Sequence, residues 1–143
     1  MLAGATPALV HNCPIYSEIE NGRRGAAYVE VTPESLASNG GTPPGGKKPD
    51  GFRKGDSRGH LIGRQFGGSG TDMRNIIAQG KDANNVTISK IEVMIADHVR
   101  DTGRAVIMSV SPVYGAAKYR AEAVRIEAVD DFGWSFDQTV SNF

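Results

Sequence analysis

The chain has 143 residues, with 16 basic against 16 acidic side chains and therefore no net formal charge, and 39% of its residues are hydrophobic. This composition suits one domain with its own core and excludes wholesale disorder, and the absence of any apolar run longer than four residues excludes a membrane-spanning helix, which needs about 20. Cys13 is the only cysteine, which excludes an internal disulfide framework and a cysteine-rich zinc site.

The first third of the chain is rich in turn and loop signals. Residues 1–22 carry small side chains, two prolines and an Asn-Gly pair, so we expect a connector ahead of a folded domain at 23–143. Alternating apolar residues predict a strand over 26–31. The stretch 38–55 is expected to be a loop, because its glycines and prolines break both regular periods. A loop of that length in a compact domain is usually functional or disordered.

The clearest predicted element is a helix over residues 84–102. Its apolar side chains recur at helical spacing, at Ile88, Ile91, Ile95 and Val99. Either Asn84 or Asn85 is expected to cap the start, and Gly103 is expected to end the helix in the left-handed conformation. His98 lies on this helix with no second histidine four residues away, which indicates a partly buried structural residue.

The last third of the chain is typical of strands. Two strands are predicted over 104–113 and 121–129, the second from its clean alternation of charged and apolar residues. A short last strand is predicted over 134–140. Strands therefore dominate around one long central helix, and this order predicts an α+β fold.

Charge is balanced over the whole chain but not along it. Residues 47–74 carry seven basic and three acidic side chains, whereas residues 121–143 carry one basic and five acidic side chains. A basic stretch on a neutral protein suits a loop that faces phosphate better than a general nucleic-acid coat. Charge alone favours the simpler interpretation, which is two solvated surfaces of opposite sign.

Two polar residues near the middle of the chain have the chemistry for phosphodiester hydrolysis. His60 ends a basic, glycine-rich loop, and an imidazole can take a proton from water near neutral pH. Asn84 stands where the helix is expected to start, and an amide oxygen there can hold a hard cation that keeps most of its waters. Taken alone, a turn histidine and a helix-capping asparagine explain the same residues, so both interpretations stay open at this point.

The spacing of these residues resembles a known family. Four motif elements follow in order, namely Arg58-Gly59-His60, then Asn75 with Gln79, then Asn84 five residues after that glutamine, then Glu92 eight residues further. This pattern over residues 56–92 resembles the DNA/RNA non-specific endonucleases, a family within the ββα-metal (His-Me finger) nucleases. The family's fold has an antiparallel sheet and one long central helix. One departure is that Ser57 replaces the family's loop-anchoring aspartate, with Asp56 one position earlier.

The resemblance implies a role for each of three residues. His60 would be the general base that activates water for in-line attack on phosphorus. Asn84 would be the one direct protein ligand of Mg²⁺, for which Mn²⁺ is an expected substitute. Glu92 would orient metal-bound waters from two helical turns away, about 80° around the axis of a regular α-helix.

The resemblance also implies supporting residues and products. Arg58 and Arg64 would neutralise charge that develops on the phosphate, while Asn75 and Gln79 would support the site. The expected activity is the hydrolysis of DNA, RNA or both to 5′-phosphate products. Little sequence preference should result, because these groups address the nucleic-acid backbone.

Two other functions compete with this interpretation. The chain could be a catalytically inactive module of the same fold that only binds nucleic acid or a protein partner; the replacement at Ser57 is its one support. It could also be a metal-independent ribonuclease that uses His60 and Arg58 and leaves 2′,3′-cyclic ends. The spacing of the metal-ligand motif argues against the ribonuclease.

A second resemblance concerns the first residues of the chain. The segment from Ala3 to Cys13, which ends in His11-Asn12-Cys13, resembles the end of a HINT (intein-like) module joined to a polymorphic bacterial toxin. In that family the His assists cyclisation of the Asn, which cuts the chain before the Cys. The resemblance implies a secreted antibacterial toxin that acts in the cytoplasm of the target cell and has a cognate immunity protein. A plain flexible tail is the alternative.

Overall fold

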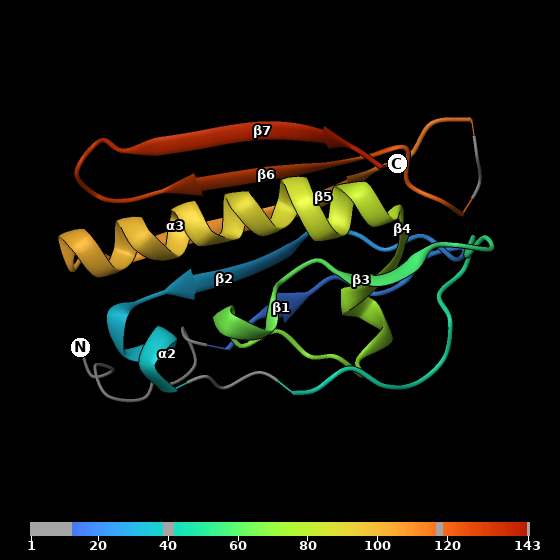
Figure 1. Cartoon of the computed structure of the whole chain (residues 1–143), viewed down its shortest axis with the longest axis horizontal. Helices are drawn as coiled ribbons and strands as arrows, with labels where there is room; N and C mark the ends of the chain where they lie inside the picture. Colours follow the sequence, from blue (N-terminus) through green and yellow to red (C-terminus); the bar gives the residue numbers. More distant parts are fainter. Residues whose placement is uncertain (1–12, 39–41, 117–118, 143) are drawn as a thin grey trace.

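A five-stranded antiparallel sheet forms one layer of the fold (Figure 1). The computed structural model describes residues 13–38, 42–116 and 119–142. The strands, in spatial order, are β1 (Ile15–Tyr16), β2 (Ala27–Val31), β5 (Val106–Val113), β6 (Ala123–Val129) and β7 (Ser135–Ser141). One long helix, α3 (Ser89–Thr102), lies across one face of this sheet. The α+β prediction is confirmed.

The four strands predicted from the sequence are the four long strands of this sheet. Their alternation sets the register: Val29 of β2 and Ala128 of β6 lie opposite Met108 of β5, and all three are buried on the helix-facing side. The opposite face carries half-exposed residues such as Ile107 and Val129. Period-two alternation therefore decides which face of the sheet the core occupies.

The sheet begins inside the segment that was expected to be a connector. Ile15 and Tyr16 form β1 and pair with Tyr28 and Ala27 of β2. The Tyr16 hydroxyl accepts a hydrogen bond of 2.9 Å from the backbone N–H of Ser69. The folded domain therefore includes residues from Ile15 onward. The sequence did not indicate this strand, because a strand of two residues is too short to show an apolar period.

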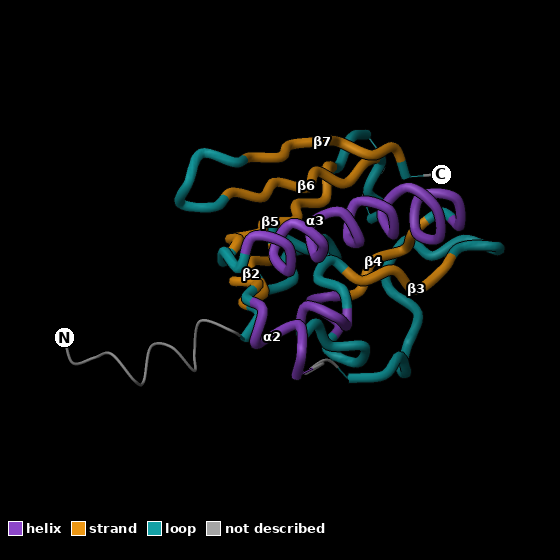
Figure 2. Tube along the Cα trace, turned by 60° about the vertical axis from the view of Figure 1, so that its left-hand side comes forward, coloured by secondary structure: helices purple, strands orange, loops and turns teal. Residues whose placement is uncertain are grey.

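A separate two-stranded ribbon carries the motif residues. It consists of β3 (Ser57–His60) and β4 (Ile76–Gln79), which pair antiparallel with His60 opposite Ile76. Figure 2 shows this ribbon beside the start of α3, apart from the five-stranded sheet. Periodicity did not predict either strand, since all four residues of β4 are buried and leave no alternation to detect.

The start of the long helix differs from the prediction. Residues 81 and 82 are already helical, and Ala83–Ile88 form a π-helical turn, η3, that leads directly into α3. The backbone N–H of Asn84 donates to the carbonyl of Gly80 at 3.0 Å, so Asn84 and Asn85 lie inside the helix and do not cap it. The predicted end is confirmed, because Gly103 is left-handed with φ of 70°.

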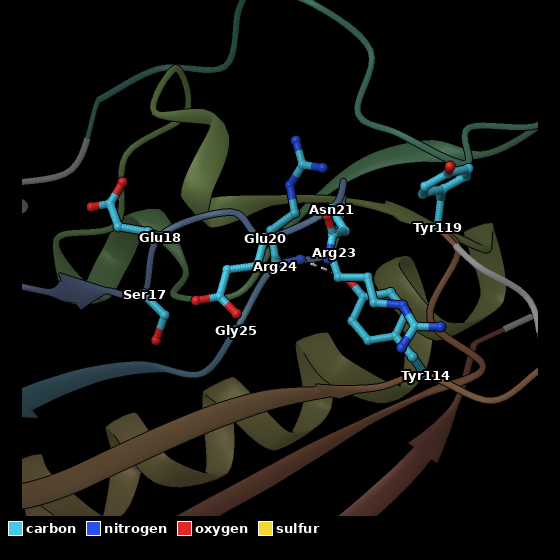
Figure 3. Close-up of a pocket in the computed structure, with 9 residues that line it drawn as sticks. All are labelled: Ser17, Glu18, Glu20, Asn21, Arg23, Arg24, Gly25, Tyr114 and Tyr119. Atoms are coloured by element: carbon cyan, nitrogen blue, oxygen red, sulfur yellow. Dashed lines mark hydrogen bonds between the residues drawn. The ribbon is translucent and has the colours of Figure 1, made fainter.

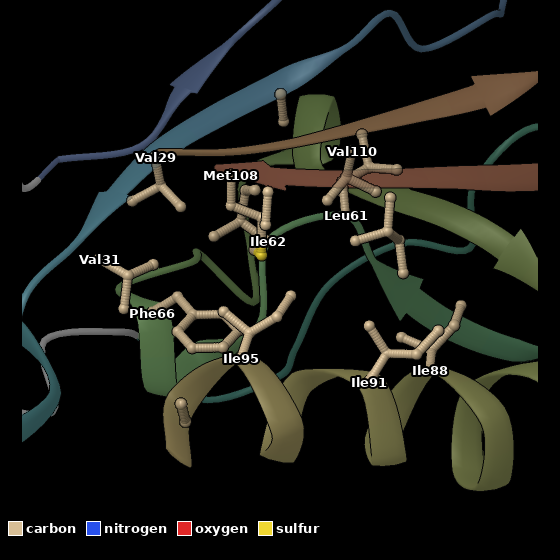
Figure 4. Packing of buried hydrophobic residues seen from close by; sticks show 14 of the residues in the cluster. Val29, Val31, Leu61, Ile62, Phe66, Ile88, Ile91, Ile95, Met108 and Val110 are labelled. Carbon is tan, nitrogen blue, oxygen red and sulfur yellow. The ribbon is translucent and has the colours of Figure 1, made fainter. Parts of the chain in front are cut away.

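The core lies between α3, the sheet and the ribbon (Figure 4). The helix contributes the apolar stripe predicted from its spacing, with Ile91, Ile95 and Val99 buried. Ile62 and Phe66, from the segment that follows His60, pack into the same cluster. This packing holds the residues after β3 against the helix that carries Glu92.

Three short helical segments complete the described structure. Their bounds are Pro33–Ser38 for α2, Arg64–Phe66 for the 3₁₀ turn η1 and Met73–Asn75 for the 3₁₀ turn η2. Helix α2 was not predicted, although its start has a recognisable signal, because the Thr32 hydroxyl accepts from the N–H of Ser35 at 3.0 Å. Among the described residues, no helix is both long and apolar enough to cross a bilayer.

Candidate active site

The ribbon and the helix bring together a histidine and a glutamate that are 32 positions apart. His60 is the last residue of β3, and Glu92 lies in the first turn of α3. The imidazole Nε2 lies 3.4 Å from Glu92 Oε2, with side chains 35% and 12% exposed. The pair is thus reachable from solvent through the histidine, as a general base that must meet water requires.

A glycine packs closely against this pair. A Cβ on Gly63 would lie 2.5 Å from Glu92 Oε2 and 3.2 Å from His60 Nε2. The backbone of Gly63 is extended, with φ of −66° and ψ of 155°, so any residue could adopt it. The missing Cβ therefore lets the Glu92 carboxylate approach the Gly63 backbone, and a side chain at this position would make that carboxylate shift.

Asn84 lies upstream of Glu92 on the same continuous helix. Its side chain is partly exposed, and its amide donates to Asn85 Oδ1 at 3.2 Å. The expected offset of about 80° from Glu92 is wrong, because it assumed a regular α-helix, whereas the intervening π turn closes wider i→i+5 hydrogen bonds. No hydrogen bond joins Asn84 to His60 or Glu92 in the described part of the chain.

These residues fit a hard divalent cation. The donor set offers an amide oxygen at Asn84 and a carboxylate at Glu92, and oxygen ligands are what such cations prefer. Solvent reaches this part of the chain, because the side chains of His60 and Glu92 are 35% and 12% exposed, and a cation of this kind retains waters. A cation that is held by one protein ligand and many waters needs few acidic side chains. This arrangement agrees with the small number of acidic groups at the site.

The two arginines predicted at the site have different surroundings. The Arg58 guanidinium donates to the carbonyls of Lys47 at 2.7 Å and Gly70 at 3.3 Å, which ties two loops to β3. Arg64 is exposed in η1, and its guanidinium makes no hydrogen bond or ion pair among the described residues. Of the two, Arg64 is the side chain that can turn toward a phosphate without giving up existing contacts.

Asn75 closes the loop that contains Gly63. It is fully buried; its Oδ1 accepts from the N–H of Ile62 at 2.9 Å, and its Nδ2 donates to the carbonyls of Ile62 at 3.1 Å and Ser69 at 2.8 Å. All three bonds go to backbone groups across the loop. This side chain therefore fixes the path of the residues that follow His60, as a supporting residue should.

Gln79 is the last residue of β4, and its side chain packs against Gly59 in the Arg58-Gly59-His60 element. Its side chain is fully buried, and within the described ranges neither its nitrogen nor its oxygen has a hydrogen-bond partner. A Cβ on Gly59, the residue before His60, would overlap the Gln79 side chain. Gly59 is therefore needed for the close approach of these two strands.

The comparisons with known proteins agree with this geometry. A sequence-family model described as DNA/RNA non-specific endonuclease matches residues 24–131, about three quarters of the chain. The chain belongs to this family. It is a nuclease, an enzyme that hydrolyses nucleic acid. A search of curated proteins found no match.

Solved structures share the fold of this nuclease. The Sda1 nuclease with bound zinc ion has a TM-score of 0.76 at 21% identity, over 91% of this chain and 73% of that one. NucA from Streptococcus agalactiae with magnesium ion bound has a TM-score of 0.75 at 16% identity, over 91% and 72%. An extracellular nuclease has a TM-score of 0.61 at 14% identity, over 91% and 84%. The ββα-metal fold is therefore confirmed.

Asp56 anchors its loop in this nuclease, one position before Ser57, which stands where the family has its loop-anchoring aspartate. Asp56 accepts two hydrogen bonds from Arg120, at 3.0 and 3.1 Å, and one from the N–H of Arg53 at 2.9 Å. Desolvation raises the pKa of Asp56, but these donors outweigh it and hold that pKa below its ordinary value. The sequence did not indicate Arg120, because its partner lies 64 residues away.

A cavity of about 710 Å³ lies elsewhere on the nuclease (Figure 3). It is lined by Ser17, Glu18, Glu20, Asn21, Arg23, Arg24, Gly25, Tyr114 and Tyr119. The Arg23 guanidinium stacks 5.0 Å above the Tyr114 ring, and the N–H of Arg24 donates to the Tyr114 hydroxyl at 2.9 Å. None of the predicted site residues that the structure describes lines it.

The predicted cleavage junction falls mostly beyond the described residues. His11 and Asn12 lie outside them, while Cys13 is described and exposed. Among the predicted site residues that the structure describes, an ion-pair contact joins His60 and Glu92. Asn75 and Gln79 pack against the residues on either side of His60, and Asn84 lies on the same helix as Glu92.

Proposed function

We propose that this nuclease is a divalent-metal-dependent endonuclease that cuts DNA, RNA or both without sequence preference and leaves 5′-phosphates. The observation that carries the proposal is the contact of 3.4 Å between His60 Nε2 and Glu92 Oε2, in which the His60 side chain is 35% exposed. A structural histidine–carboxylate pair needs no access to solvent. A hydrolytic site needs it, because the base must meet water and the phosphate.

His60 would act as the general base. When Nε2–H donates to Glu92, the lone pair of Nδ1 remains to take a proton from water. The water oxygen then bonds to phosphorus and the P–O3′ bond breaks. The departing 3′ oxygen takes a proton from a second water, so a 5′-phosphate and a 3′-hydroxyl result. The exposed Arg64 would balance the negative charge that develops on the phosphate during this step. Arg58 would also balance this charge, from the position in which its hydrogen bonds to the neighbouring loops hold it.

Asn84 and Glu92 would hold the cation, Asn84 directly and Glu92 through waters. When bound, Mg²⁺ would supply Lewis-acid charge at the phosphate oxygens and at the departing 3′ oxygen. Solved nucleases of the same fold contain zinc in one case and magnesium in another, which supports a divalent metal. We propose Mg²⁺ as the natural ion and Mn²⁺ as a substitute, since the oxygen donor set suits hard cations.

We also propose that the nuclease is the C-terminal toxin of a larger secreted bacterial protein. The His11-Asn12-Cys13 sequence supports a HINT-like remnant that ends before Cys13, over residues 1–12, and two extracellular nucleases of the same fold support export. The toxin would act in the cytoplasm of a target cell, and a cognate immunity protein would protect the producer.

The activity is tested by incubating the protein with supercoiled plasmid and with single-stranded RNA in Mg²⁺, with and without chelator. We expect cleavage only with the metal, by the wild type and not by H60A, and products that a ligase accepts without added kinase. Cleavage in chelator with 2′,3′-cyclic ends would select a metal-independent ribonuclease. Binding without cleavage in Mg²⁺ and Mn²⁺ would select an inactive binding module.

The toxin role needs its own experiment. Induced expression of the wild-type chain in the bacterial cytoplasm should arrest growth and degrade nucleic acid, and H60A should restore growth at equal protein level. Normal growth with wild-type protein that is active in vitro would contradict the toxin role while leaving the nuclease intact.

A further inference from the structure

Asn142 follows β7 at the end of the described chain and is almost fully buried. Its Oδ1 accepts from the N–H of Gly80 at 2.9 Å, and its Nδ2 donates to the carbonyls of Ala78 at 3.0 Å and Ala121 at 2.7 Å. Both donor hydrogens and one acceptor position of the amide are therefore used, all on backbone groups of other segments. Asn142 lies beyond residues 24–131, which the family model matches.

The segment that Asn142 holds leads directly into the helix of the site. Gly80 joins β4 to that helix; its N–H is bound by Asn142, and its carbonyl accepts from the N–H of Asn84 at 3.0 Å. Two consecutive hydrogen bonds thus connect Asn142 to the backbone of the proposed metal ligand. Strand β7 also packs against η3, the π turn that contains Asn84.

Asn142 is itself fixed from both sides. Its backbone N–H donates to the carbonyl of Glu122 at 3.0 Å, and its carbonyl accepts from Arg120 Nη1 at 3.0 Å. Arg120 also binds Asp56 at the start of the ribbon. The end of the five-stranded sheet, the ribbon and the start of the helix are therefore joined at this one residue.

An apolar residue could fill this position but could not replace its bonds. Without the amide, the buried N–H of Gly80 and the carbonyl of Ala78 would lose their partners, and such groups are costly when unpaired. The backbone around Gly80, between β4 and the helix, would then shift so that water could replace these hydrogen-bond partners. Because Asn84 is held by that same stretch of backbone, its side chain would lose a defined position.

We propose that Asn142 is a positioning residue that sets Asn84 for metal binding, an inference that rests on the proposed function. Changes to residues that support a metal ligand usually cost about 10–100-fold in metal affinity. The structure therefore assigns part of the metal affinity to a residue just after β7 that, in the described part of the chain, makes no hydrogen bond to the Asn84 side chain or to His60.

The test compares N142A with V140A. Val140 is equally buried in the same strand, but its side chain is apolar and has no bond to Gly80, so V140A controls for loss of packing. We expect both variants to have a lower Tm. We expect only N142A to raise the Mg²⁺ dissociation constant, by about tenfold or more, in calorimetry without substrate and well below both Tm values.

The Mg²⁺ midpoint of plasmid cleavage should shift in parallel with the dissociation constant for N142A and stay unchanged for V140A. If N142A does not fold, N142S, which keeps a short polar side chain, should show a smaller shift in the same direction. Equal Mg²⁺ dissociation constants for the alanine or serine variant and V140A would overturn the inference. Wild-type protein that neither binds Mg²⁺ nor cleaves would instead overturn the proposed function.

Discussion

Helix α3 takes part in two histidine–carboxylate pairs, one near each end. The two pairs share their residue types but differ in contact distance, burial and hydrogen-bond partners. Near its start, Glu92 meets His60 at 3.4 Å. Near its end, His98 Nε2 meets Asp130 Oδ2 at 2.8 Å, and the Asp130 side chain is fully buried. Asp130 also accepts from the N–H groups of Phe132 at 2.7 Å and Trp134 at 3.0 Å.

The surroundings of each pair decide what it can do. The Trp134 ring stacks on the His98 imidazole with centroids 3.9 Å apart, so the second pair is covered and its acceptors are occupied. The first pair has one long contact and a histidine that is 35% exposed. Residue types alone would not separate a structural pair from a reactive one, whereas unoccupied acceptors and solvent exposure do.

The largest expected effect breaks the comparison directly by removing each histidine in turn. H60A should lower the cleavage rate by about 10²–10⁴-fold through loss of the general base, with little change in Tm. H98A should lower Tm, because it removes a bond and a stacking partner from Asp130 and Trp134, and should leave the rate unchanged. Single-turnover plasmid cleavage and thermal melts of both variants measure the two effects. Equal cleavage by H60A and wild type would refute the proposed mechanism.

The second prediction sharpens the chemistry of the reactive pair. E92Q keeps the shape of Glu92 but not its charge, so it should raise the Mg²⁺ midpoint of cleavage by about 10–100-fold, and added Mg²⁺ should recover part of the rate. N84A should lose activity that modest extra Mg²⁺ does not restore, because it removes the proposed direct ligand. Mg²⁺ titrations of the cleavage rate compare the two. An unchanged midpoint for E92Q would count against its role in orienting waters.

The third prediction tests whether the close approach of Gly63 to the reactive pair matters. In G63A the new methyl group would displace the Glu92 carboxylate, and we expect a roughly tenfold loss of rate from this misplacement. G45A is the matched control, because a Cβ there would meet only Thr71 Cγ2, at 3.8 Å. Wild-type activity in G63A would show that cleavage does not depend on this position of the Glu92 carboxylate.

Local pattern explains which parts of the molecule could be predicted. The apolar period indicated the long helix and its end at Gly103, and alternation indicated the four long strands. The π turn was missed, because the hydrogen-bond shift it makes leaves no mark in apolar spacing. Likewise β4 is buried on all sides and shows no period.

The site divides in the same way. His60 and Glu92 were predicted from the spacing of a family motif, and the structure adds their contact, which comes from the packing of the ribbon on the helix. The hydrogen bonds of Arg120 and Asn142 could not be predicted, because their partners lie 64 and 62 residues away and only the tertiary fold joins them. The close approach of Gly63 to Glu92 could not be predicted either, because it is visible only once the neighbours of Gly63 are placed.

The smallest expected effect concerns the covered pair and pH. Burial raises the pKa of Asp130, but the hydrogen bonds from His98, Phe132 and Trp134 outweigh it and hold that pKa below its ordinary value of 3.8. The folded protein therefore binds fewer protons at this group than the unfolded chain does. Its stabilisation is fully present above about pH 4 and disappears as the pH falls through the lowered pKa.

D130N removes this titration, and Arg104, whose guanidinium lies 4.0 Å from Asp130, keeps its charge in both proteins. The variant should have a lower Tm than wild type at pH 7 and a smaller further loss of Tm between pH 5 and 3. Its cleavage rate at pH 7 should equal that of wild type, since the covered pair takes no part in the chemistry. A parallel loss of Tm with acid in both proteins would place the acid sensitivity at other carboxylates, of which Asp56 with its lowered pKa is the first to examine by D56N.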